Sequence, residues 1–71
     1  MGMLDRLTHT VFVCQGSIPG QYRASNESLF YVYRQVWQRS ALLTTVVHGS
    51  FHDKKDADAR AVEVQKEYTF S

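Results

Sequence analysis

The segment that decides the fold is residues 28–39, with the sequence SLFYVYRQVWQR. As a helix, this segment forms a single apolar stripe that Ser25 or Asn26 can cap. As a strand, it is rich in the aromatic and β-branched residues that strands favour. The tetrapeptide at 38–41 is a poor hairpin turn, which favours the helix. Residue type carries more weight here, so we predict a strand and keep the helix as the alternative.

A strand over this segment has two different faces, because successive side chains point to opposite sides. One face carries Phe30, Val32, Arg34 and Val36, and the other carries Leu29, Tyr31, Tyr33, Gln35 and Trp37. The second face therefore holds most of the aromatic rings of the segment.

Two flanking segments are also predicted as strands. Residues 8–14, THTVFVC, are mostly β-branched or aromatic and end before Gly16. In that strand His9 and Cys14 fall on opposite faces. Residues 42–51 contain four adjacent β-branched residues, which are stiff at χ1 and disfavour a helix. In the loop after the first strand, Pro19-Gly20 suits the centre of a type II turn.

Residues 53–68 carry the clearest helical pattern. Acidic residues crowd the start of this segment, where the helix dipole favours negative charge. Asp56 and Arg60 are four residues apart and can pair on one helix face. Apolar residues recur at helical spacing, at Ala57, Ala61, Val64 and Tyr68. We therefore expect this helix to lay a narrow apolar stripe on a sheet.

Together these elements predict an α+β fold with the order β-β-β-α. Residues 1–71 are expected to form a single small domain, a three-stranded antiparallel sheet packed on one face by the C-terminal helix. One helix covers one face of such a sheet, so the other face is expected to stay uncovered. A binding function is expected on that uncovered face.

Composition limits the classes of function. The chain has 71 residues and a formal net charge of +1, which argues against a protein that coats DNA through many phosphate contacts. A core this small is marginally stable, so self-association into a homodimer is a favoured state. A single cysteine and the lack of a signal peptide or a long apolar run indicate a cytoplasmic protein without a membrane partner.

The residues that could carry catalysis or bind a metal form only weak patterns. Cys14 could form a nucleophilic pair with His9 or His48, but a cysteine that ends an apolar strand usually packs as a small apolar residue. His48 and His52 could share a metal on a continuous helix, which Gly49 and the preceding β-branched run make improbable. We expect no enzyme activity, no cofactor and no metal site.

The aromatic segment is the most informative feature for function. Tyr, Trp and Arg are enriched at binding hot spots between proteins, so the first hypothesis is a protein-protein interaction module, an adaptor or an inhibitor. The alternative is a single-stranded nucleic-acid-binding domain that uses the same rings as a stacking platform. A third interpretation makes these rings ordinary core beneath the helix. The residues expected to contact a partner are Tyr31, Tyr33, Trp37, Arg39, Tyr22 and Arg23.

Overall fold

The computed structural model describes residues 6–69, which form three strands followed by one helix. The strands are β1 (Leu7–Gln15), β2 (Phe30–Gln38) and β3 (Ala41–Phe51), and the helix is α1 (Lys54–Thr69). The strands form one antiparallel sheet in the order β1-β2-β3. This is the predicted β-β-β-α architecture, and the prediction of a strand over the deciding segment is confirmed.

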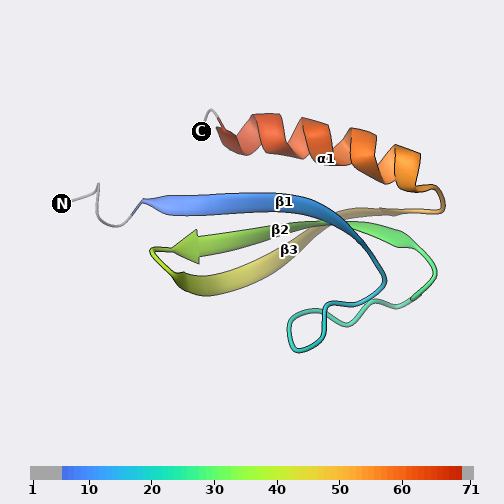
Figure 1. The fold of residues 1–71 in the computed structure, drawn as a ribbon, viewed down its shortest axis with the longest axis horizontal. Coiled ribbons are helices and arrows are strands. Elements are labelled where there is room, and N and C mark those ends of the chain that lie inside the picture. Colours follow the sequence, from blue (N-terminus) through green and yellow to red (C-terminus); the bar gives the residue numbers. More distant parts are fainter. Residues whose placement is uncertain (1–5, 70–71) are drawn as a thin grey trace.

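The helix α1 packs on one face of the sheet, and the loop over residues 16–29 folds against the opposite face (Figure 1). On the helix side, Ala57 and Val64 of α1 are fully buried against Val32 of β2. Ala61 and Tyr68 pack on the same cluster, so the predicted apolar stripe of the helix is confirmed.

The loop side was predicted wrongly. The sequence predicts an uncovered second face, but Ala24, Ile18, Tyr22 and Leu29 of the loop region pack with β2 and its neighbours into a second apolar cluster. One helix covers only one face of a sheet, and the loop buries the aromatic rings on the face that the helix leaves open. The third interpretation is correct that rings of this segment form core, since Tyr31 and Tyr33 are buried. It is wrong about their cover, which is the loop and not the helix.

Two tight turns shape the sheet and its loop. The Pro19-Gly20 turn is confirmed, because Gly20 has a φ of 78° and the Gln21 amide donates to the Ile18 carbonyl at 3.0 Å. The β2–β3 hairpin closes through Arg39 and Ser40, where the sequence argues against a turn. Arg39 has a φ of 58°, the left-handed conformation that two-residue hairpin turns require at their first position.

The ion pairs on α1 differ from the predicted one. Lys54 pairs with Asp58 at 3.0 Å, and Arg60 pairs with Glu63 at 3.1 Å instead of with Asp56. Arg60 also reaches the sheet, which draws its guanidinium away from the start of the helix. Within residues 6–69, no helix is both long and apolar enough to cross a membrane.

Candidate functional site: the open end of the β2–β3 hairpin

Tyr31 and Tyr33 lie beneath the loop and are not available to a partner. Tyr31 is 4% exposed and Tyr33 is 0% exposed. The Tyr33 hydroxyl donates to the Gly16 carbonyl at 2.5 Å, and the Tyr31 hydroxyl accepts from the Asn26 amide at 3.1 Å. Burial raises the pKa of Tyr33 to about 12. The prediction that these two rings stand on an open face is therefore wrong.

Tyr22 and Arg23 lie on the covering loop. The Tyr22 ring is half-buried and meets the Tyr33 ring edge-on, with 5.6 Å between the ring centroids. Arg23 is exposed and lines an open hollow of about 500 Å3 in the loop, together with Tyr22 and Glu27. Tyr22 thus belongs mainly to the packing of the loop, and Arg23 is the more accessible of the two.

A short hydrogen-bonded network inside the loop holds it over the tyrosines. The Glu27 carboxylate accepts from the amide of Ser17 at 2.9 Å and also from the Ser17 hydroxyl. That hydroxyl in turn accepts from the Ala24 amide at 2.7 Å. The two hydrogen bonds from Ser17 lower the pKa of Glu27, so the carboxylate remains ionised in this network.

The loop leaves the hairpin end of the same sheet face open. Trp37 lies there, paired in register with Thr8 of β1 and Leu42 of β3, and is half-buried. Leu43 is 52% exposed, at a point where the β2–β3 register shifts by one residue. Arg39 is exposed in the turn. We call Trp37, Arg39, Leu42 and Leu43 the hairpin-end surface.

An open groove of about 290 Å3 runs beside the hairpin-end surface. Residues 42–45 line one side of this groove, and Gly20 and Gln21 at the tip of the loop line the other. Gln21 fixes the tip in place, because its side-chain oxygen accepts from Gln35 at 2.6 Å and from Thr45 at 3.2 Å. The loop and the hairpin together therefore form a shaped, mainly polar groove beside the hairpin-end surface.

The helix-covered face carries a separate polar cluster around Arg34. The Nε of Arg34 donates to Nε2 of His48 at 2.8 Å, and its Nη1 donates to Nδ1 of His9 at 2.9 Å. The guanidinium also lies 4.0 Å from the centre of the Tyr68 ring. Burial, followed by the nearby charge of Arg34, lowers the pKa of both His9 and His48. Each histidine therefore presents an unprotonated nitrogen to the arginine.

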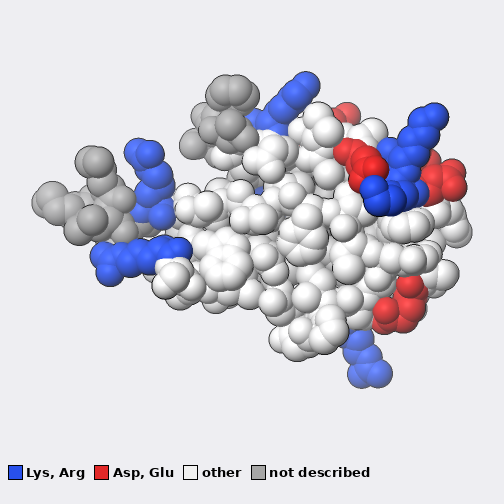
Figure 2. All heavy atoms as spheres, in the orientation of Figure 1, with Lys and Arg blue, Asp and Glu red and all other residues white. Residues whose placement is uncertain are grey.

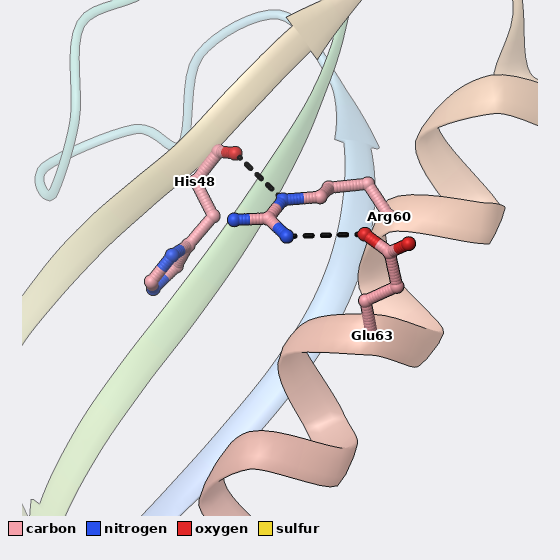
Figure 3. Close-up of polar contacts among 3 residues, drawn as sticks. All are labelled: His48, Arg60 and Glu63. Carbon is pink, nitrogen blue, oxygen red and sulfur yellow. Dashed lines mark hydrogen bonds and ion pairs between the residues drawn. The ribbon is translucent and has the colours of Figure 1, made fainter.

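His48 joins this cluster to α1 through its backbone (Figure 3). The carbonyl of His48 accepts from Nε of Arg60 at 3.4 Å, and Arg60 reaches Glu63 through its Nη1 at 3.1 Å. The His48 ring points away from the Arg60 guanidinium and toward β2, where it meets Arg34. The cluster around Arg34 thus links the sheet to the helix, and its polar groups are hydrogen-bonded to one another.

The residues considered for catalysis do not come together. Cys14 packs in the loop-covered cluster, whereas His9 and His48 contact Arg34 and Tyr68 on the helix side. The sheet separates the thiol from both imidazoles, so the structure contains no thiol-imidazole pair at these positions. His52 is exposed beyond the end of β3, and no group of three or more possible metal ligands is found among residues 6–69.

Of the residues predicted to contact a partner, Trp37 and Arg39 lie on the hairpin-end surface, whereas Leu42, Leu43 and Gln21 were not among the predicted residues. Leu43 is exposed at the register shift between β2 and β3, and no sequence pattern indicates that shift. Nothing in the sequence indicates that Gln21 reaches across to the sheet. Comparisons of the chain with protein-family models, curated proteins and solved structures found no match.

Proposed function

We propose that this chain is a non-enzymatic protein-protein interaction module, an adaptor or an inhibitor, that binds its partner through the hairpin-end surface. The observation that carries this proposal is the position of Trp37, which the loop does not cover and which Leu42 and Leu43 flank. A tryptophan beside one exposed and one half-buried leucine, with an arginine at the rim, has the composition of a binding hot spot. The groove beside Gln21 gives this surface a shape that a partner can complement.

The nucleic-acid alternative receives less support from the geometry. A stacking platform needs several accessible rings along a basic groove. Tyr31 and Tyr33 are buried, so Trp37 is the ring of β2 that remains for stacking on this face. In the view of Figure 2, Lys and Arg side chains stand mainly toward the ends of the molecule and do not form a continuous basic track over the strands.

The test of this proposal is capture of partners from a cell extract on immobilised protein. Trp37→Ala is expected to weaken retention of a specific partner by about 2 kcal/mol, as for a hot-spot residue. Leu43→Ser should also weaken retention of the same partner, because Leu43 is the exposed leucine of this surface. Val62→Ser is the matched control, since Val62 is 55% exposed on α1, away from the hairpin end.

A partner that Trp37→Ala and Leu43→Ser retain as strongly as the control Val62→Ser would contradict the proposal. Circular dichroism of each variant verifies that the fold is intact before retention is compared. Titration of Trp37 fluorescence with a mixed-sequence single-stranded oligonucleotide tests the alternative: quenching at low salt that physiological salt reverses would place nucleic acid first.

A further inference from the structure

The outer edge of β1 is a long strand edge without a partner strand in the described sheet. In the order β1-β2-β3, β1 pairs with β2 on one side only. Its register with β2 runs without a shift from Leu7↔Gln38 to Gln15↔Phe30. The sequence of β1, LTHTVFVCQ, contains no charged residue and no proline, which are the residues that usually protect an edge.

The other edge of the sheet, β3, is built differently. Its pairing with β2 is interrupted by two register shifts, between Tyr31 and Tyr33 and between Val36 and Trp37. Gly49, with a φ of 144°, lies at the first of these shifts. Such irregularities bend and twist an edge and discourage further pairing. Of the two edges, β1 is therefore the one suited to adding a strand.

Beside the edge of β1 lies an apolar groove of about 310 Å3 between the strand and the helix. Val11 lines it from β1, and Ala61, Val62, Gln65 and Lys66 line it from α1. Val62 is 55% exposed, the highest exposure among the large apolar residues that the structure describes. In Figure 2 the central surface over the strands carries no Lys, Arg, Asp or Glu.

We infer that β1 pairs antiparallel with β1 of a second copy of this chain, about a two-fold axis at Val11. Val11 is the middle residue of β1, and it also lines the groove that exposes Val62. The edge of β1 and the exposed side of α1 at Val62 therefore both lie beside the proposed two-fold axis. The product is a six-stranded sheet in which two helices lie side by side on one face.

Pairing about Val11 keeps both helices on the same side of the sheet. It places Leu7 opposite Gln15 and His9 opposite Val13, and partners across an antiparallel pair point to the same face. The α1 helix contacts all three strands of its own sheet, and its contacts with β1 are the most extensive. With strands about 4.8 Å apart, two helices whose centres each lie about one strand spacing from the two-fold axis would be about 10 Å apart, a normal packing distance.

The charges on α1 match their own copy across this axis. Asp58, Val62 and Lys66 are spaced four residues apart and form one row on the helix surface. A two-fold axis beside Val62 makes the two helices antiparallel, which places Asp58 of each chain opposite Lys66 of the other. Within one helix these two residues are eight positions apart and do not pair; Asp58 pairs there with Lys54, and Lys66 of the second copy would be its second cation. The row is thus complementary to a second copy of itself.

This dimer interface is separate from the hairpin-end surface, so the two proposals are tested independently. The experiment is sedimentation equilibrium of the full chain over a range of concentrations. The wild-type chain is expected to sediment at twice its mass of 8.2 kDa. Val62→Lys should raise the dimer dissociation constant by about tenfold or more, which is about 1.4 kcal/mol. Leu43→Lys is the matched control at an equally exposed site and should leave the dimer intact.

Charge reversal identifies the geometry of the dimer. Asp58→Lys and Lys66→Asp should each weaken it, because each places like charges across the axis, and the double variant should restore it. A wild-type chain that sediments at 8.2 kDa at sub-millimolar concentration would overturn the inference. So would a dimer that Leu43→Lys dissociates and Val62→Lys does not, because its interface would then lie at the hairpin end. A monomer whose β1 amides become protected only with an added peptide would assign the edge to a different partner.

Discussion

The two faces of β2 are covered by two different kinds of structure. On one face, Val32 packs against the regular stripe of α1, and Arg34 beside it is held by two histidines. On the other face, Tyr31 and Tyr33 are covered by an irregular loop that depends on hydrogen bonds from Ser17 to the Glu27 carboxylate and from the Ala24 amide to the Ser17 hydroxyl. A helix covers a sheet through its apolar period, whereas a loop does so through individual polar contacts. The two covers should therefore respond differently to the same kind of change.

The largest effect is expected from removing a ring beneath the loop. Tyr33→Ala should lower the free energy of unfolding by about 3–5 kcal/mol, because it leaves a cavity the size of an aromatic ring. Val64→Ala on the helix-covered face should lower it by about 2 kcal/mol, since it removes two buried carbon groups. Urea denaturation measures both.

The loss at Tyr33 is comparable with the whole stability of a chain this small, so Tyr33→Ala can fail to fold. Tyr33→Phe keeps the ring and removes only the hydrogen bond to the Gly16 carbonyl, at a cost of about 1–2 kcal/mol. If Val64→Ala proved more damaging than Tyr33→Ala, the loop would not be a true second cover of the sheet.

Two glycines in the loop allow the cost of an unfavourable backbone conformation to be measured separately from the cost of a steric clash. Gly16 and Gly20 both have a φ of 78°. A Cβ at Gly16 would clash with the Glu27 side chain, whereas a Cβ at Gly20 would meet nothing within 4 Å. Gly20→Ala should cost about 1 kcal/mol from its conformation, and Gly16→Ala about 1–2 kcal/mol more. Thermal denaturation compares the two variants, and equal losses would show that the approach of Glu27 does not support the loop.

The smallest effect is expected from acidification, and it acts on the helix-covered face. Because the folded chain lowers the pKa of His9 and His48, the unfolded chain binds protons more readily. Their contribution to stability is full above their ordinary pKa of 6.5 and declines as the pH falls through the lowered values in the folded chain.

Urea midpoints at pH 7.5 and pH 5.5 measure this decline. His48→Asn should reduce the difference between the two midpoints, because it removes one of the titrating groups. His52→Asn serves as the control, since His52 is exposed and lies outside the cluster around Arg34. A pH dependence that His48→Asn and His9→Asn both leave unchanged would exclude the cluster around Arg34 as its source.

The sequence was sufficient to predict the elements and the orientation of their side chains. Alternation placed Phe30 and Tyr31 on opposite faces, and helical spacing identified Ala57 and Val64 as the buried stripe, as the structure shows. Both predictions rest on a hydrophobic period that repeats several times, and a repeated period can be recognised in the sequence alone.

The cover over Tyr31 and Tyr33 has no such period. It depends on single contacts between residues about ten positions apart, such as Ser17 with Glu27, and no local pattern announces them. The candidate site changed for the same reason. The loop does not cover Trp37 and Arg39 because its tip, at Gln21, reaches only to Gln35 and Thr45, and the reach of a loop is a property of its folded shape.

The unequal lengths of the two connections also fix an order of assembly. The β2–β3 turn contains only Arg39 and Ser40, whereas β1 and β2 are joined through residues 16–29. Closing a short loop costs less chain entropy than closing a long one, so the hairpin is the natural folding nucleus and β1 is added to its edge later. Until β1 arrives, the edge of β2 is open to any extended chain, including β1 of another molecule. Exchange of β1 between copies is thus the misfolding route to which this topology is most exposed.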